Sequence, residues 1–322
     1  MRMSVDRVAI LLLSAFAVLP LSAQERFPSQ PIRLIVPSAP GGGTDSTFRL
    51  LAELAESDLG QKVVIINRPG ASGSIAATTL NTSKPDGYTI AGIWGDIVTV
   101  VPHTTQVSYT PASFAPISLS VTVPLVFCVK PGFPAKNGAE FLAALKAKPD
   151  EYTYGTDGTG GAVHLAAERI FTQTAVKARM IPFTDSATIL RSFMGGHIDI
   201  YGGVIGIIQQ HVQSGEARCV LVSSADKNPS MPEATSLAEL KLEGASTLIW
   251  RGIIGVKGTP DDRLKFLEAT FSKAAKTERF KEFMNKQGGN AVGGSATELN
   301  AIIQHDYEAF GKLVRELGLA NK

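Results

Sequence analysis

Two glycine clusters carry the residues that are best suited to hold a small ligand. The first follows the apolar segment 33–37, precedes a helical pattern over 46–59, and contains Ser38, Pro40, Gly41, Gly42 and Gly43. The second follows 152–154, precedes a helical pattern over 162–171 that includes His164, and contains Thr156, Asp157, Gly158, Thr159 and Gly160. Each junction leaves unpaired backbone N–H groups at the positive end of a helix, which a ligand can approach closely at glycine. Two such anion-binding junctions predict a cleft that closes on an anionic small molecule.

The remaining motifs do not support catalysis. Neither cluster has the lysine of a phosphate-binding P-loop or completes a Gly-x-Gly-x-x-Gly dinucleotide pattern. The segment 70–74 does not match the Gly-x-Ser-x-Gly of serine hydrolases, and the five histidines form no His-Glu-x-x-His pair. We therefore expect a binding protein rather than an enzyme, with no cofactor and no metal. His164 either packs near its helix start or points a ring N–H into the cleft, whereas Asp45 is expected to complement the helix dipole and not to contact the ligand.

The 322-residue chain has an ordinary globular composition, with 44% hydrophobic and 19% charged residues and a net charge of +2. No basic run is interleaved with aromatic residues, so we expect no nucleic-acid partner. A weakly basic start and the apolar stretch 8–21 predict a signal peptide over residues 1–23 and a mature chain that begins at Gln24 in the periplasm. An uncleaved membrane anchor is the alternative, but the apolar run is short and Pro20 interrupts it.

From Ile32 onward, short apolar β-branched runs alternate with amphipathic helical stripes. This pattern predicts an α/β fold with two hinged lobes, each a doubly wound mixed sheet flanked by helices. Loops rich in proline or polar residues divide the chain into lobe 1, residues 24–125 plus 223–322, and lobe 2, residues 126–222. The chain crossings that form the hinge are expected near Cys128 and Cys219. The segments 260–286 and 297–317 are predicted to be amphipathic helices.

Cys128 and Cys219 each lie in a short apolar strand pattern of an exported protein. Two cysteines so far apart are too few for a zinc site. Two buried free thiols are the interpretation that we favour. A disulfide between adjacent strands is the alternative, which an oxidising compartment permits.

Seven segments occur in a fixed order along the mature chain. They are Pro31-Ile32-Arg33, the triple-glycine segment 37–45, Asn67-Arg68-Pro69-Gly70-Ala71, Pro85-Asp86-Gly87-Tyr88-Thr89, His164-Leu165-Ala166, Gly195-Gly196-His197-Ile198-Asp199 and Gly258-Thr259-Pro260. Together they resemble the Bug-type solute receptors, the periplasmic binding subunits of tripartite tricarboxylate transporters. The resemblance covers essentially the whole mature chain.

The resemblance implies a two-lobed periplasmic binding protein of type II that binds an organic carboxylate and performs no catalysis. In such receptors the first glycine loop, here Pro40, Gly41, Gly42 and Gly43, holds a carboxylate through backbone amides and ordered water. The second loop, from Thr156 to Gly161 with His164, would close from the other lobe. The ligand would then pass to a large and a small membrane permease subunit; a sensor that presents the same ligand to a signalling partner is the alternative. We expect a monomer, because no long exposed apolar stripe suggests a partner surface.

The chain departs from the family pattern at positions near the expected ligand. It has Phe183-Thr184-Asp185 in place of Tyr-Lys-Gly, Gly202-Gly203 in place of an aspartate, Trp94-Gly95-Asp96 in place of small hydroxyl residues, and Arg251 in place of an aromatic residue. These departures suggest a cleft for an aromatic dicarboxylate, with Asp96 among its contacts. Trp94, Phe183 and Tyr201 would stack on the ligand, and Arg251 would bind the distal carboxylate in a bidentate manner. The alternative is that the aromatic side chains belong to the cores of the lobes.

Overall fold

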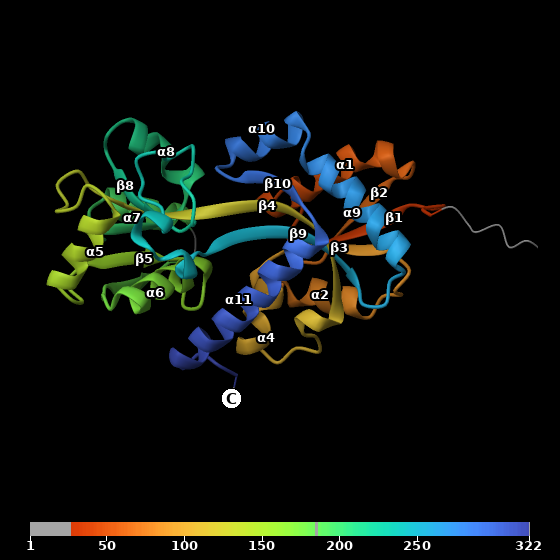
Figure 1. The fold of residues 1–322 in the computed structure, drawn as a ribbon, viewed down its shortest axis with the longest axis horizontal. Helices are drawn as coiled ribbons and strands as arrows, with labels where there is room; N and C mark the ends of the chain where they lie inside the picture. The colour runs from red at the N-terminus through yellow and green to blue at the C-terminus, as the bar shows by residue number, and fades with distance from the viewer. Residues whose placement is uncertain (1–26, 184–185, 322) are drawn as a thin grey trace, which may run out of the picture.

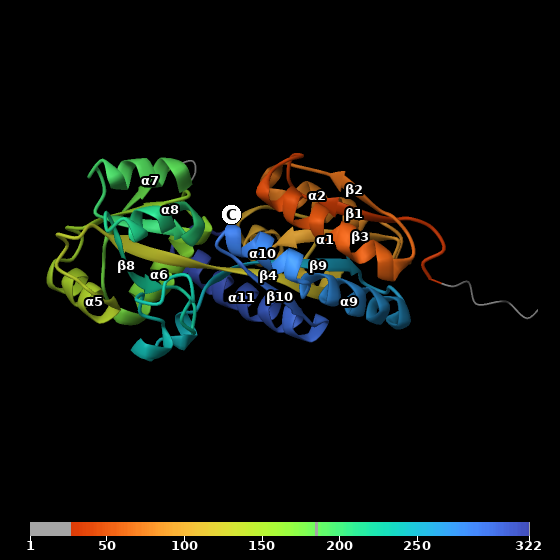
Figure 2. The same cartoon turned by 90° about the horizontal axis from the view of Figure 1, so that it is seen from above.

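A computed structural model describes residues 27–183 and 186–321 of the chain. It consists of two lobes that lie along the long axis of the molecule, with strands running from one lobe into the other (Figures 1 and 2). The expected signal peptide over residues 1–23, the mature start at Gln24, and Thr184 and Asp185 lie outside the described residues. Within the described ranges, no helix combines the length and the apolar character that spanning a bilayer requires.

Lobe 1 is built on a mixed sheet with the strand order β2–β1–β3–β9–β4, and β10 pairs with the other edge of β4. Its strands are β1 (Ile32–Val36), β2 (Val63–Asn67), β3 (Thr89–Trp94), β9 (Leu248–Val256), β10 (Asn290–Gly294) and the first part of β4 (Phe114–Val129). One face is covered by α1 (Gly43–Leu59), α9 (Asp261–Ala275) and α10 (Glu278–Lys286). The other face is covered by α2 (Ser74–Asn81), α3 (Asp96–Thr99) and α11 (Ala296–Glu316), and α4 (Val101–Thr104) follows α3. The apolar stripe around Phe48 buries α1 against the sheet, as its spacing predicts.

Lobe 2 repeats this architecture with the strand order β8–β4–β7–β5–β6. Its strands are the second part of β4, β5 (Thr153–Thr156), β6 (Arg179–Pro182), β7 (Ile200–Val204) and β8 (Arg218–Val222). The helices α5 (Gly138–Ala147) and α6 (Ala162–Thr174) pack on one face, and α7 (Ser186–Met194) and α8 (Ile205–Gln213) pack on the other. The predicted α/β fold, with a doubly wound mixed sheet in each lobe, is confirmed.

The two lobes are connected by strands rather than by loops. β4 is a 16-residue strand whose first part pairs with β9 and whose second part pairs with β7 and β8. At the crossing Pro124 is in register with Leu248, and Ile249 packs against the cores of both lobes. The first crossing thus lies a few residues before Cys128, close to its expected place, whereas the second lies in β9 and not near Cys219, which is inside lobe 2.

The chain between β8 and β9 packs with lobe 2. Leu237 and Ala245 are buried in the same cluster as Phe127 and Leu221. This segment contains two short 3-10 turns, at Ala238–Leu240 and Glu243–Ala245. The expected division into residues 24–125 plus 223–322 and residues 126–222 assigned this segment to lobe 1, and we propose that the second boundary lies near Thr247 instead.

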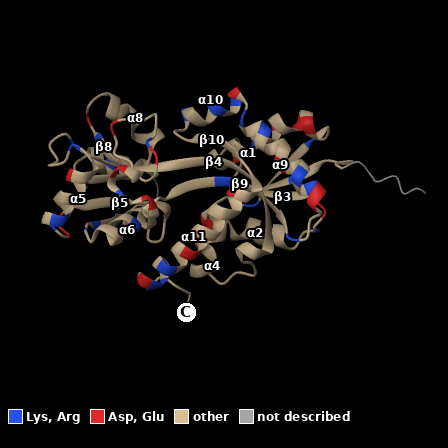
Figure 3. Ribbon diagram, in the orientation of Figure 1, with Lys and Arg blue, Asp and Glu red and all other residues tan. Residues whose placement is uncertain are grey.

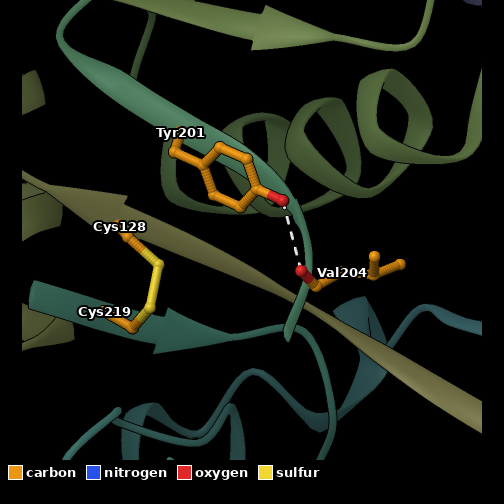
Figure 4. Close-up of a disulfide and its surroundings, with 4 residues drawn as sticks. All are labelled: Cys128, Tyr201, Val204 and Cys219. Atoms are coloured by element: carbon orange, nitrogen blue, oxygen red, sulfur yellow. Dashed lines mark hydrogen bonds between the residues drawn. A yellow bond between two sulfur atoms is a disulfide. The ribbon is translucent and has the colours of Figure 1, made fainter. Parts of the chain in front are cut away.

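Cys128 of β4 and Cys219 of β8 form a disulfide (Figure 4). The two strands are antiparallel, and their register sets the two cysteines directly opposite each other. The favoured interpretation of two free thiols is therefore wrong. The pairing depends on which residues of β8 face which residues of β4, and a register between distant strands cannot be read from spacing along the chain.

The helix α11 forms a second connection between the lobes, running from the sheet of lobe 1 towards α6 (Figure 1). Phe310, Leu313 and Val314 in its last turns share a buried apolar cluster with Leu165 of α6. The carbonyl of His103, next to this cluster, accepts a hydrogen bond from the N–H of Asn321 at 2.9 Å. The C-terminal helix thereby brings the end of the chain to the boundary between the lobes.

Candidate ligand-binding cleft

A cavity of 490 Å³ lies between the two lobes. Lobe 1 contributes the turn before α2, the end of β3 and the short helices α3 and α4, and lobe 2 contributes the loop between β5 and α6. The lining residues are Ser72, Trp94, Asp96, Val100, Val101, Thr104, Asp157, Thr159, Gly160, Gly161 and Leu319. The ends of β3 and β5 are carboxyl ends of parallel strands, where sheets of this kind bind ligands. No group of three His, Cys, Asp or Glu side chains suited to a metal ion occurs within residues 27–183 and 186–321.

The cavity brings together part of the predicted site. Of the residues predicted to contact the ligand, the lining contains Trp94, Asp96, Asp157, Thr159 and Gly160. The predicted residues outside the lining are Ser38, Pro40, Gly41, Gly42, Gly43, Thr156, Gly158, His164, Phe183, Tyr201 and Arg251. Gly161, the last residue of the predicted second loop, also lines the cavity, whereas sequence reasoning missed Ser72, Val100, Val101, Thr104 and Leu319.

The turn that presents Ser72 had a usable signal in the sequence. Ala71 and Ser72 have φ angles of 45° and 51°, in the left-handed region that residues with a side chain rarely adopt. Gly73 continues with a φ of 86°, and a Cβ atom there would collide with the side chain of Ile97. The two glycines that flank Ala71 and Ser72 mark an unusual turn, which a comparison with the hydrolase motif alone does not detect.

Asp96 is positioned by a close approach of the chain to Trp250. A Cβ atom on Gly95 would come within 2.6 Å of the indole ring, so only glycine fits where β3 turns into α3. The carboxylate of Asp96 makes no hydrogen bond to another described residue and faces the cavity. Burial raises the pKa of Asp96 to about 7, and the nearby charges of Asp157 and Asp306 act in the same direction.

The second glycine loop is held in place by two of its own side chains. The N–H of Val163 donates to Oδ1 of Asp157 at 3.1 Å, and the N–H of Gly160 donates to Nδ1 of His164 at 2.9 Å. Burial lowers the pKa of His164 and raises the pKa of Asp157. His164 is therefore neutral at neutral pH, and its Nδ1 is used as an acceptor that fixes the loop at the start of α6.

Two backbone amides of the first glycine loop are hydrogen-bonded to acceptors in the same part of the protein. The N–H of Gly41 donates to Oδ2 of Asp45 at 2.9 Å, and the N–H of Gly42 donates to a carbonyl of the same loop at 3.3 Å. Oδ1 of Asp45 accepts hydrogen bonds from Asn67 at 2.8 Å and from Arg49 at 2.9 Å. Burial opposes ionisation of Asp45, but these hydrogen bonds outweigh it and lower its pKa. Acceptors within the protein thus occupy these two amides, which the resemblance implied would hold the ligand.

Arg251 lies in β9 with Trp94 of β3 and Val121 of β4 as its register partners. Residues opposite each other in such a ladder share one face of the sheet, so the side chains of Arg251 and Trp94 are neighbours. Nε of Arg251 is buried and has no hydrogen-bond partner among the described residues. Burial alone lowers the pKa of Arg251, and no carboxylate in the described part of the chain lies close enough to raise it. Figure 3 shows the strands that join the lobes mainly in tan, with a blue segment in β9.

Two further buried donors lie on the same line across the sheet. Among the described residues, the other buried side-chain atoms without a hydrogen-bond partner are the hydroxyl oxygens of Ser38 and Ser120. Ser38 follows β1, and the register of β1 against β3 places it level with Trp94. Ser120 is the extra residue of a bulge in β4, between Leu119, which pairs with Gly252, and Val121, which pairs with Arg251. All three groups can donate hydrogen bonds, and none of them has a partner among the described residues, so an anionic ligand could accept from each of them.

The aromatic side chains expected at the ligand have different positions. The ring of Tyr201 is fully buried in the core of lobe 2, near Phe193, and its hydroxyl donates to the carbonyl of Val204 at 3.2 Å (Figure 4). Phe183 is half-buried and packs against the same core. Of the three expected stacking residues, Trp94 lines the cavity. Tyr201 is a core residue, as the alternative interpretation expected.

A buried polar cluster fastens the lobes together beside the cavity. The guanidinium of Arg169 in α6 lies 3.8 Å from Asp306 in α11 and donates to the carbonyl of Gly244 at 3.0 Å. Asp306 also accepts a hydrogen bond from Nε1 of Trp250 at 3.0 Å. Burial raises the pKa of Asp306, partly offset by Trp250 and Arg169. The charge of Asp306 thus has a buried cationic partner, whereas Asp96 has none among the described residues.

Residues 47–319 match the family model described as "Tripartite tricarboxylate transporter family receptor", TctC. The chain belongs to this family. It is 30% identical to a UPF0065 protein of Bordetella pertussis over 92% of both chains. It is 27% identical to Protein BugT of the same organism, over 97% of this chain and 96% of BugT.

Solved structures give the same assignment. A TctC solute binding protein from Polaromonas is 28% identical with a TM-score of 0.84, over 90% of this chain and 99% of that chain. Periplasmic binding protein BugD is 27% identical with a TM-score of 0.69, over 92% and 100% of the two chains. Rpa4515 of R. palustris with adipate is 27% identical with a TM-score of 0.71, over 91% and 99%. The predicted Bug-type binding protein, rather than an enzyme, is confirmed.

Proposed function

We propose that this protein captures an organic carboxylate between its two lobes and delivers it to the large and small membrane permease subunits of a tripartite transporter. Arg251 carries the proposal, because Nε of its guanidinium is buried without a hydrogen-bond partner among the described residues, in the strand next to Trp94. A buried donor without a partner destabilises a folded protein, and a bound carboxylate removes that cost. The hydroxyl groups of Ser38 and Ser120 offer further donors on the same line.

These donors are sufficient in energy for a transport receptor. A hydrogen bond to a charged group contributes about 1.5–3 kcal/mol, and a guanidinium can form two such bonds with one carboxylate. Micromolar binding requires about 8 kcal/mol. Arg251 and the serine hydroxyls supply much of this, and burial of apolar ligand surface against Trp94 and Val100 supplies more. The structure of Rpa4515 with adipate supports the same ligand class.

We further propose that the ligand has a flat ring that lies on Trp94. The finer prediction of an aromatic dicarboxylate draws support from the position of Trp94 in the cavity lining. It draws none for the second carboxylate, because the described residues that line the cavity include no lysine or arginine. The proposed ligand therefore has one carboxylate and a flat ring that lies on Trp94.

The proposed place of action is the periplasm, after removal of residues 1–23. The periplasmic binding protein BugD, similar over most of this chain, supports that location. A monomer is proposed because the large apolar side chains that are exposed among the described residues, Val64 and Ile75, lie on separate elements and form no common surface.

Isothermal titration of the mature protein with benzoate, terephthalate and adipate tests the ligand class. We expect micromolar binding of at least one of them and a more than tenfold loss in Arg251→Lys, because lysine cannot bind a carboxylate in a bidentate manner. Arg279→Lys is the matched control, since Arg279 is exposed and paired with Glu53 on the outer surface. Binding to none of the acids, or unchanged binding in Arg251→Lys, refutes the proposal. Uptake of the labelled acid by cells with and without the receptor tests delivery to the permease.

A further inference from the structure

The charged groups that line the cavity are acidic. Asp96 of lobe 1 and Asp157 of lobe 2 are its two charged side chains, and the lining formed by the described residues contains no lysine, arginine or histidine. Asp306, the other acid near Asp96, is paired with Arg169 and is not part of the lining. Asp157 accepts the N–H of Val163 but forms no ion pair within residues 27–183 and 186–321. The two lobes therefore present two carboxylates without an ion-pair partner among the described residues to one shared cavity.

Arg251 does not pair with these carboxylates. It is not part of the cavity lining, and within residues 27–183 and 186–321 no ion pair joins it to Asp96 or Asp157. The donor pole, defined as Arg251, Ser38 and Ser120, thus lies beside the cavity next to Trp94 and is not part of its lining, whereas the acceptor pole, defined as Asp96 and Asp157, lines the cavity itself.

We propose that the natural ligand is a zwitterion whose carboxylate binds at the donor pole and whose ammonium or other cationic group binds between Asp96 and Asp157, against the ring of Trp94. This inference rests on the proposed function as a carboxylate receptor. Tryptophan is the aromatic side chain that attracts a cation most strongly, and it lines the cavity together with both carboxylates. A dicarboxylate would instead bring a third negative charge to the acceptor pole.

The cationic group also couples binding to closure of the lobes. Asp96 belongs to lobe 1 and Asp157 to lobe 2, so their like charges oppose closure when the cleft is empty. A cation between them replaces this repulsion by attraction to both lobes. Protonation of Asp96 is the other way to relieve the repulsion, and it would favour a dicarboxylate at low pH. The two ligand classes therefore differ in the direction of their pH dependence.

Matched ligand pairs test the charge of the group at the acceptor pole. Adipate and 5-aminopentanoate differ by the replacement of one carboxylate by an ammonium, and so do terephthalate and 4-(aminomethyl)benzoate. We expect an amino acid of these pairs to bind at least tenfold more tightly than its diacid at pH 8, and this preference to shrink at pH 6. Asp96→Asn and Asp157→Asn should each weaken binding of the amino acid at least tenfold without weakening the diacid. An asparagine side chain at either position keeps the size, and at position 157 it can still accept the N–H of Val163.

The control is Asp226→Asn, which removes an exposed carboxylate far from the cavity lining and should change neither affinity. The melting temperature of Asp96→Asn without ligand should equal or exceed that of the wild type, which separates a lost contact from a lost fold. The zwitterion proposal is refuted if the diacids bind more tightly than the amino acids and Asp96→Asn leaves the ratio of the two affinities unchanged. The proposed carboxylate receptor is unaffected by that result. Binding of neither member of any pair overturns the receptor and the zwitterion together.

Discussion

Replacement of Arg251 by methionine should stabilise the free protein and abolish its response to ligand. Nε of Arg251 is buried without a partner among the described residues, and a buried unsatisfied donor costs about 1–3 kcal/mol. Methionine has a similar length and fills irregular space, so the substitution removes this cost without opening a cavity. At roughly 2 °C per kcal/mol for a chain of this size, the melting temperature should rise by about 2–6 °C.

The same substitution removes the two hydrogen bonds proposed to bind the carboxylate. Their loss amounts to at least about 3 kcal/mol, or a more than hundredfold loss of affinity. A ligand at a hundred times its dissociation constant stabilises the wild type by about 2.7 kcal/mol, and this shift should vanish in Arg251→Met. Thermal melts with and without ligand measure both effects, and Arg279→Met serves as an exposed control. A less stable free protein, or a ligand shift that persists, would contradict the role assigned to Arg251.

Three further predictions test other parts of the structure. The folded-state pKa of Asp96 is raised to about 7 from a usual 3.8, so the folded protein holds a proton that the unfolded chain has lost, and stability should fall as the pH rises from about 4 to 7. Urea unfolding across this pH range should show a smaller fall in the free energy of unfolding for Asp96→Asn than for the wild type. Equal slopes of this free energy against pH would contradict the raised pKa of Asp96. The double substitution Cys128→Ala, Cys219→Ala should lower the free energy of unfolding by about 2–5 kcal/mol and make it insensitive to dithiothreitol, whereas a dithiothreitol effect that survives would argue against the disulfide. Arg169→Met should lower the free energy of unfolding by about 3–5 kcal/mol, because Asp306 loses its buried cation. Adding Asp306→Asn should recover part of this loss, and a double variant no more stable than Arg169→Met would contradict the importance of the pair.

The helices and the lobe architecture were predictable because their signals are local. The apolar stripe around Phe48 and the glycines before it identify α1 without knowledge of its partners. The predicted helix over 260–286 is divided in the structure, because the side chain of Thr277 caps a new helix, α10, by accepting the N–H of Phe280. A threonine followed by a glutamate is itself a local signal, so this break could have been predicted.

The crossing strand was harder to predict because its prolines indicate a boundary. Pro116 and Pro124 lie inside β4, at a register shift and at the passage between the lobes. Both are places where a strand can lack an N–H donor. Their positions carry meaning only once the pairing partners of β4 are known.

Part of the cavity lining was predicted from the sequence, and part was missed. Trp94, Asp96 and Asp157 stand at strand ends, where chemistry and position coincide. Thr104 and Leu319 reach the same cavity from segments that are far apart in the sequence, and only the packing of α11 brings them together. The inward-facing amide of Gly41 was likewise hidden, because it depends on the side-chain conformation of Asp45.

The paired strands β4 and β9 limit how the two halves of the protein can move. A flexible tether would let the lobes swing independently, but Val123 and Pro124 are in register with Ile249 and Leu248 where the chain passes between the lobes. Any change in the angle between the lobes must therefore bend or twist a two-stranded ribbon and also shift the contact between α11 and α6. The lobes are thus restrained on two sides, by a pair of strands and by the end of a helix.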